Sequence, residues 1–289
     1  MAIVVASTAS NSVSTGTSVT INKPTGLAVG DLMICVCSAQ GGSVTVDTLS
    51  GWTSADFENG SNNYTKIQYK YADSGDVAAS NFTFTSAFSV NLMGGTIMRV
   101  TGVVGSSPVD VTDSQNYNST AATDISFSGT FAIANNGALV VTGFCGSVQG
   151  VSGAGTIGTY VASDGTLSWT ELHDYGEDDG TADPIIGGAY AIQSTAATLT
   201  SYGATLSLSR QVHTGVLAVF KQQINASGTT TLHAADADFF APTASAGTTG
   251  THTLLSVDAD QFSPTSRATS PSQWTTESKP TTTWTPESK

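Results

Sequence analysis

The sequence predicts an all-β protein: a jelly-roll-like β-sandwich followed by an extended C-terminal arm. Short runs, either apolar or alternating apolar with polar residues, recur along most of the chain between clusters of Gly, Asn, Ser and Pro. That pattern is typical of proteins built from many short strands. The 30 glycines in 289 residues and the many Ser and Thr residues favour turns and polar strand faces. No segment keeps the 3.6-residue apolar period of an amphipathic helix.

The segment 24–40 is expected to hold the central strand. It opens with Pro24, Gly26 and Gly30, residue types that favour a turn. The run 32–37 that follows is short and apolar at every position. A run of this kind, bounded by turn residues, indicates a strand that is buried on both faces.

The other strands are expected in order along the chain. They cover 3–7, 18–22, 43–49, 64–72, 81–85, 94–104, 125–133, 138–145, 187–193, 196–209 and 212–220. Three polar stretches between them, 56–63, 110–123 and 174–180, are expected to be loops, and the last of these is acidic. Trp52 is expected to fill one end of the core, with a platform for a ligand as the alternative.

Charge and composition exclude several classes of protein. The formal net charge is −13 with only nine Lys and Arg residues, which argues against nucleic-acid binding because phosphate contacts need basic side chains. No window approaches the roughly 18 apolar residues of a membrane span. The first residues lack the positive start and long apolar core of a signal peptide. The chain is therefore expected to be made in the cytoplasm of a cell.

The three cysteines are Cys35, Cys37 and Cys145, and all lie in apolar runs. Cys35 and Cys37 alternate along one strand, so they are expected to face the same side. In a protein made in a reducing cell such cysteines are usually small buried hydrophobic residues. A disulfide from Cys145 to either of the other two is left open.

The composition changes after Phe220, where aliphatic residues become scarce and Thr, Ser, Ala and Pro frequent. Two domains are therefore expected: a β-sandwich at 1–224 and an extended, repeat-containing arm at 225–289.

The arm contains two kinds of repeat. Thr231-Leu232 and the stretch 236–243 recur 22 positions further on, and the Trp-Thr-x-Glu-Ser-Lys sequence at 274–279 recurs ten positions further on. Two copies of such a unit cannot bury a core alone, so the arm is either disordered or ordered on another surface. The second is favoured, because the aromatic residues of the arm are spaced as anchors that a flexible linker would not need. The expected partner-binding anchors are Phe240, Pro242, Phe262, Pro264, Trp274 and Trp284.

Chemistry is sparse. The chain has no Gly-x-Ser-x-Gly elbow, phosphate loop or His-Glu-x-x-His motif, and neither enzyme activity nor a cofactor is expected. Weak candidates for calcium ligands are Asp236, Asp238, Asp258 and Asp260. Alternating carboxylates in an extended chain face one side, although Asp in such places is also a common turn former.

A second acidic cluster surrounds His173 and Asp174. Together with Glu177, Asp178 and Asp179 these residues could bind a metal or act on a sugar. The alternative is a solvated acidic turn, because the order of residues departs from that of a calcium loop. A glycan-cleaving enzyme that uses Glu171, Asp174 or Glu177 is the least favoured interpretation, since nothing holds a carboxylate pair in place.

Several short motifs resemble those of phage and prophage virion structural proteins. They are Pro24-x-Gly26-x-x-x-Gly30-Asp31, Gly51-Trp52-Thr53, Tyr69-x-Tyr71-Ala72, Gly102-Val103 with Pro108-Val109-Asp110, and Gly215-Val216-Leu217-Ala218-Val219-Phe220. The Asp-Ala-Asp-x-Phe-x-Pro-Thr repeats and the Trp-Thr-x-Glu-Ser-Lys ending are similar to the C-terminal extensions of phage structural proteins. The resemblance implies a jelly-roll-like sandwich that assembles on a virion and has no enzyme activity.

These observations favour a capsid decoration or head-fibre protein. The sandwich would face outward, and the arm would dock on capsid or tail subunits of the virion. The protein itself is expected to form a homo-oligomer. A tail, neck or fibre component is the first alternative. The second is a carbohydrate-binding adhesin for the host surface, in which Trp52, Trp169 or the strand from Tyr64 to Tyr71 stacks on sugars.

Overall fold

The chain divides into two compact units, which we call the head unit (residues 1–223) and the arm unit (residues 224–289). The computed structural model describes residues 1–60, 62–147, 153–163, 166–178, 180, 183–223, 230–233, 252–255 and 274–276. The boundary expected from the sequence lies one residue further along the chain. No helix in these ranges is long and apolar enough to cross a membrane. The prediction of an all-β sandwich is confirmed.

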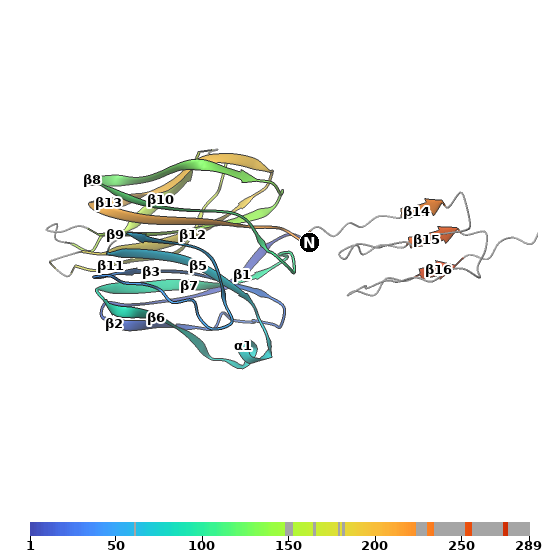
Figure 1. The fold of residues 1–289 in the computed structure, drawn as a ribbon, viewed down its shortest axis with the longest axis horizontal. Helices are drawn as coiled ribbons and strands as arrows, with labels where there is room; N and C mark the ends of the chain where they lie inside the picture. The colour runs from blue at the N-terminus through green and yellow to red at the C-terminus, as the bar shows by residue number, and fades with distance from the viewer. Residues whose placement is uncertain are drawn as a thin grey trace, which may run out of the picture. The chain divides into compact units, whose positions relative to one another are not determined.

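The head unit is built from antiparallel sheets (Figure 1). The first sheet has the order β1 (Val4–Val13), β7 (Leu92–Thr101), β3 (Leu32–Gln40), β5 (Asn63–Tyr71) and β4 (Thr53–Gly60). A separate ribbon pairs β2 (Gly16–Asn22) with β6 (Asn81–Val90), and the short helix α1 (Ser74–Ala78) precedes β6.

The second sheet contains the later strands. Its order is β10 (Ile157–Ala162), β13 (Ala197–Phe220), β9 (Ala138–Ser147), β12 (Ile185–Gln193) and β11 (Thr170–Gly176), and β8 (Val109–Ile133) also pairs with β13. The first part of β13 pairs with β10 and the last part pairs with β9. β8 follows β13 through both parts. The long strands β8 and β13 therefore belong to two layers.

Three large apolar clusters fill the spaces between these layers, and a small fourth one joins Leu92 of β7 to Cys145 and Ile186 of the second sheet. One joins the β2–β6 ribbon to the first sheet, the second lies between the two sheets, and the third lies on the outer side of the second sheet. β3 is buried at every position because it contributes to two clusters. Met33 faces the ribbon, whereas Ile34 faces the second sheet. The predicted central strand is confirmed.

The cysteines also follow the prediction. Cys35 and Cys37 belong to the same cluster, so they face the same side of β3. Both thiols and that of Cys145 are free and fully buried, and the disulfide left open by the sequence is absent.

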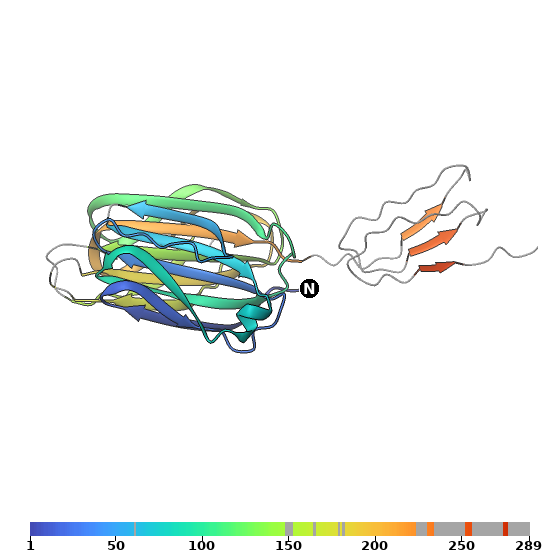
Figure 2. The ribbon, with the colours of Figure 1, turned by 60° about the horizontal axis from the view of Figure 1, so that its bottom comes forward.

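The two halves of the head unit repeat one topology, which the sequence did not reveal. Strands β1, β7, β3, β5 and β4 of the first half correspond to β8, β13, β9, β12 and β11 of the second, in the same sheet order. The β2–β6 ribbon corresponds to the outer parts of β8 and β13. Figure 2 shows the resulting stack of layers from a second side.

Register supports this correspondence. Ile34 pairs with Tyr69 in the first half, and Val141 pairs with Tyr190 in the second. Ile34 and Val141 both lie in the cluster between the sheets. Equivalent strands thus face each other across that cluster, as equivalent surfaces do in an isologous interface.

The outer strands of both halves carry the same irregularity. Trp52 stands just before β4 and a bulge ends at Asp56, while Trp169 stands just before β11 and a bulge ends at His173. The spacing from tryptophan to bulge is the same in both halves. A bulge increases local twist, so both edge strands bend at equivalent points.

Two predicted loops are strands, and one predicted strand is not. β4 replaces most of the loop expected at 56–63, and β8 replaces the one expected at 110–123. Polar residues are tolerated in β4 and β8 because backbone pairing with β5 and β13 holds these strands in place. The two strands therefore need little apolar burial. The segment 43–49 has no assigned strand, although Val44 and Val46 are buried. The acidic loop expected from 174 begins later, since β11 continues to Gly176.

Candidate functional site

Most of the residues predicted to bind partners lie outside the described residues. This applies to Phe240, Pro242, Phe262, Pro264 and Trp284. It applies equally to the metal candidates Asp236, Asp238, Asp258 and Asp260. Trp274 is the exception among the anchors: it begins a strand of the arm unit.

The described part of the arm unit is a parallel sheet of three short strands (Figure 2). β14 (Thr230–His233) pairs with β15 (His252–Leu255), and β15 pairs with β16 (Trp274–Thr276). Every residue of β14 pairs with the residue 22 positions further along the chain. The register is thus the 22-residue repeat that the sequence showed at Thr231-Leu232.

The third strand continues the same rule. His252 pairs with Trp274 and Thr253 pairs with Thr275, again 22 positions apart. This third copy was not expected from the sequence, because the ten-residue Trp-Thr-x-Glu-Ser-Lys repeat dominates the region and the Asp-Ala-Asp stretch of the other copies is lost. The signal was nevertheless present, because Thr recurs at 231, 253 and 275, an aromatic residue at 240, 262 and 284, and Pro at 242, 264 and 286.

The described sheet of the arm unit has two outer strands, β14 and β16. Within the described strands, β14 and β16 each pair only with β15. An edge strand presents unpaired N–H and C=O groups and can template pairing with another chain. β14 and β16 are therefore the clearest backbone docking surfaces of the arm unit.

In the head unit, His173 does not form a surface site with Asp174. Its side chain is buried, and ring atom Nδ1 lies 2.9 Å from Thr96 Oγ1. The Thr96 hydroxyl donates to the carbonyl of Leu172 at 3.2 Å. The hydroxyl oxygen therefore accepts from Nδ1–H, and Nε2 is the unprotonated ring nitrogen. Burial lowers the pKa of His173 to about 3.

Asp174, the next residue along β11, has a structural role. Its Oδ1 accepts a hydrogen bond from the backbone N–H of Ile157 at 3.0 Å. Burial raises the pKa of this carboxyl to about 6. Asp179 lies outside the described residues. Within the parts of the chain that the structure describes, no group of three His, Cys, Asp or Glu residues could hold a metal ion.

The aromatic residues proposed for sugar stacking are largely internal. Trp52 is 7% exposed and packs edge-on against Phe82 and Phe84, so its expected core role is confirmed. Tyr64 is also buried. Trp169 is partly buried and packs against Tyr160, with ring centroids 6.3 Å apart.

One exposed aromatic residue escaped the sequence analysis. Phe57 is 48% exposed on β4, and its ring stacks on Tyr64 with centroids 5.7 Å apart. The Lys66 ammonium lies 5.6 Å from the Phe57 centroid and donates to the carbonyl of Val46. Burial lowers the pKa of Lys66. The segment 56–63 was expected to be a loop, which hid the alternation that exposes this ring.

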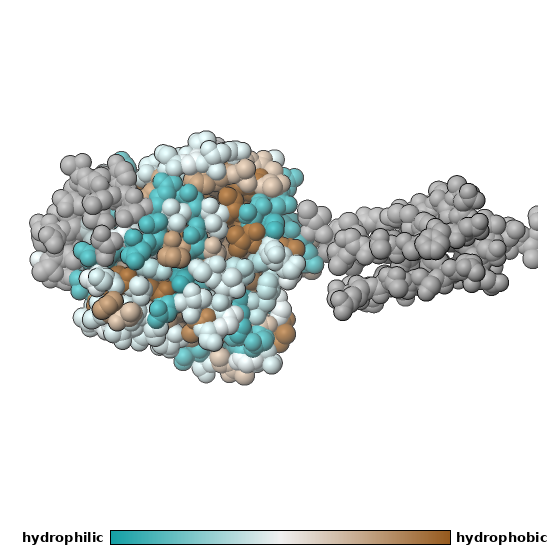
Figure 3. Space-filling view, in the orientation of Figure 1, coloured by the Kyte–Doolittle hydropathy of each residue, from teal (hydrophilic) through white to brown (hydrophobic). Residues whose placement is uncertain are grey.

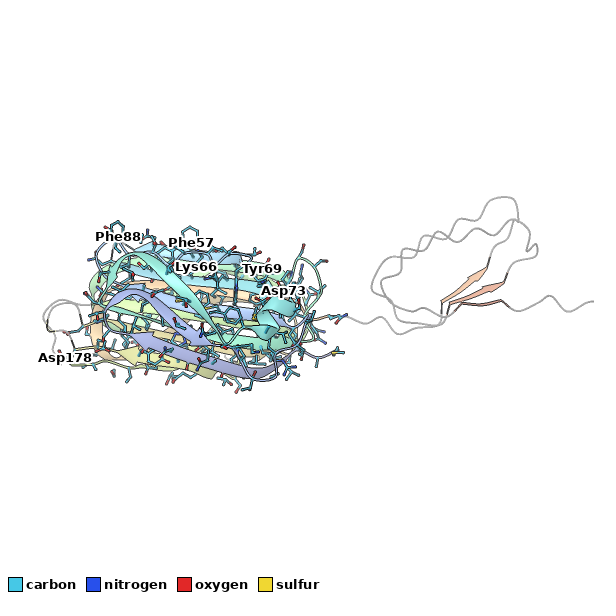
Figure 4. The ribbon with its side chains drawn as sticks, turned by 90° about the horizontal axis from the view of Figure 1, so that it is seen from below. Phe57, Lys66, Tyr69, Asp73, Phe88 and Asp178 are labelled. Carbon is cyan, nitrogen blue, oxygen red and sulfur yellow. The ribbon has the colours of Figure 1, made fainter. Side chains whose placement is uncertain are left out.

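Phe88 on β6 is a second exposed ring, 54% accessible, and Figure 4 shows it on the same side of the head unit as Phe57. Elsewhere the face in Figure 3 is mostly polar or weakly polar, with apolar residues in scattered spots. Single exposed apolar residues of this kind are normal on soluble proteins. The arm unit therefore remains the stronger candidate for attachment.

Comparisons of the chain with protein-family models, with curated proteins and with solved structures find no match.

Proposed function

We propose that this chain is a non-enzymatic structural protein of a phage particle, of the capsid-decoration or head-fibre type. The head unit folds independently and is displayed, and the arm unit attaches it to other virion proteins. The protein is made in the host cytoplasm and ends up in the virion as a homo-oligomer.

The observation that carries this proposal is the repeating sheet of the arm unit. Among the described residues, three strands pair in parallel at a constant 22-residue offset, and the outer edges of β14 and β16 have no partner strand. Parallel edges accept further strands through backbone hydrogen bonds, the mode of docking called β-augmentation. Many such weak contacts, repeated over a symmetric particle, give an attachment much tighter than any one contact. The virion-protein motifs of the sequence point the same way.

The head unit supplies its own core, which supports a display role. The four apolar clusters of the described residues consist of residues between Ile3 and Phe220. The protein's N-terminal ammonium group also donates to the carbonyl of Gln223 at 3.0 Å, which ties both ends of the head unit together. A chain that ends near residue 224 keeps every one of these contacts.

The test compares full-length protein with a truncated chain lacking 225–289. Both are produced while particles assemble, and their copy number on purified particles is measured by mass spectrometry. We expect the truncated chain to fold, with a melting temperature close to that of the full chain, and to be lost from particles. Full occupancy by the truncated chain contradicts the proposal.

A point substitution repeats the test on the full-length chain. In Thr253→Pro the central strand β15 loses a backbone N–H, and because β15 is paired on both sides one ladder bond is lost whichever way that N–H points. Thr253→Val keeps the N–H and is the matched control. Reduced occupancy for Thr253→Pro alone supports attachment through the sheet.

The carbohydrate-binding adhesin is distinguished by a glycan array with the full-length protein. Because Trp52 and Tyr64 are buried, specific glycan binding would have to use other residues. Binding that persists in the truncated chain, together with its full retention on particles, would favour the adhesin or a tail, neck or fibre component with a different attachment.

A further inference from the structure

The two open edges of the arm unit are complementary to each other. β15 pairs with β14 on one side and with β16 on the other, always in parallel and at the same 22-residue offset. The outer edge of β16 is therefore equivalent to the edge of β15 that binds β16. In the same way, the outer edge of β14 is equivalent to the edge of β16 that binds β15.

The three strands of the arm unit differ in sequence although they pair in one register. Thr231, Thr253 and Thr275 occupy the middle position of this register, whereas their neighbours Thr230, His252 and Trp274 differ in size and polarity. Backbone pairing thus dominates, as expected for strand addition. Because β14 and β16 both already pair with β15, each can pair with another edge that has the same strand direction and register.

We propose that β16 of one copy accepts β14 of a second copy, so that copies of this chain join head to tail through a continuous parallel sheet. The occupant of the open edge is thus another molecule of the same protein. This inference rests on the proposed function and names one partner of the arm unit, a second copy of the chain; the outer strands at the two ends of the joined stack remain for other virion proteins.

The size of the head unit limits how far such a stack grows. Strands in a sheet lie about 4.8 Å apart, so three strands advance the stack by roughly 14 Å per copy. A unit of 223 residues has a radius of gyration of about 17 Å, which makes it wider than this advance. Successive head units must splay outward, and the expected product is a small oligomer rather than a long fibre.

Cysteine cross-linking of the full-length protein tests the predicted register between copies. One preparation carries Thr231→Cys and a second carries Thr275→Cys, and the two are mixed, equilibrated and oxidised. Head-to-tail joining places these positions opposite each other at the new junction, within disulfide distance. Within one chain they are two strands apart, roughly 9.6 Å, which is too far for a bridge.

The chain is suited to this experiment because its native thiols do not compete. Cys35, Cys37 and Cys145 are fully buried, and burial raises the pKa of Cys145, which suppresses the reactive thiolate. A Thr253→Cys preparation mixed with Thr275→Cys is the negative control, since β15 is already paired on both sides. Both substitutions in one chain form the positive control, because Thr253 and Thr275 are direct partners.

We expect the 231/275 mixture to shift from monomer to a reducible dimer on non-reducing gels, with little dimer from either variant alone or from the negative control. The inference is overturned if the mixture stays monomeric while the positive control closes. A positive control that fails to close also overturns it, since the sheet is then absent. Dimers from Thr275→Cys alone indicate pairing of like edges and refute it as well. Copy number on particles is measured independently of cross-linking, so a mixture that stays monomeric while the positive control closes overturns this inference and leaves the proposed function standing. A positive control that fails to close counts against both.

Discussion

His173 offers a direct test of how burial controls charge in the head unit. We consider His173→Gln, which keeps a polar side chain of similar reach but removes the titrating ring. In the folded protein the ring donates through Nδ1 to Thr96, and within the described part of the chain no group accepts from Nε2. A proton on Nε2 would therefore place an unpaired charge in the interior.

The magnitude follows from the pKa of about 3 that His173 has in the folded protein. An unfolded histidine has a pKa of about 6.5, so the folded state has the lowered value. Above pH 6.5 the ring is neutral in both the folded and the unfolded protein, so the contribution of His173 to stability is complete. As pH falls from 6.5 toward 3, the unfolded histidine binds a proton that the folded one does not, and stability is lost. Each pH unit below 6.5 costs about 1.36 kcal/mol, which amounts to about 2 kcal/mol at pH 5.

The assay is urea unfolding followed by tryptophan fluorescence, at pH 7 and at pH 5, on the wild type and on His173→Gln. Whatever the difference in unfolding free energy is at pH 7, it should shift by about 2 kcal/mol in favour of the variant at pH 5. Asp174, whose pKa is raised to about 6, opposes this trend in the wild type, but both proteins carry it. A difference that does not change with pH would refute the assignment of a buried neutral ring.

Two further predictions concern packing, each with a matched control and each measured by urea or thermal unfolding. Trp52→Ala should destabilise the head unit by about 3–5 kcal/mol, because the indole is buried in the core, whereas Phe88→Ala at an exposed ring should change stability by less than about 0.5 kcal/mol. Equal effects would mean that the core role of Trp52 is wrong. Gly95→Ala places a Cβ 2.3 Å from the carbonyl oxygen of Val36, and overpacking of this kind should cost about 3 kcal/mol or prevent folding. Gly105→Ala, which meets nothing within 4 Å, should be nearly neutral, and a stable Gly95→Ala protein would contradict the close approach of β7 to β3.

Local patterns in the sequence determined which strands are buried and on which face. The apolar run at 32–37 predicted a strand covered on both sides, and the alternation at 125–133 predicted one with a single buried face; both are confirmed. The 22-residue repeat likewise predicted equivalent positions in the arm, and the strands pair at that offset. Periodicity carries this information because side chains alternate across a strand.

Only the tertiary structure decided which polar stretches are strands and which halves correspond. The segment 110–123 lacks a clear apolar face, yet all of it belongs to β8 because a distant strand, β13, pairs with it. His173 becomes a buried, neutral residue only because β7 brings Thr96 against it. The sheet order that makes the halves equivalent, with bulges at matching places, depends on pairings between residues far apart in the chain. Partners of this kind leave no trace in a local window, since backbone hydrogen bonds are indifferent to the side chains that separate them.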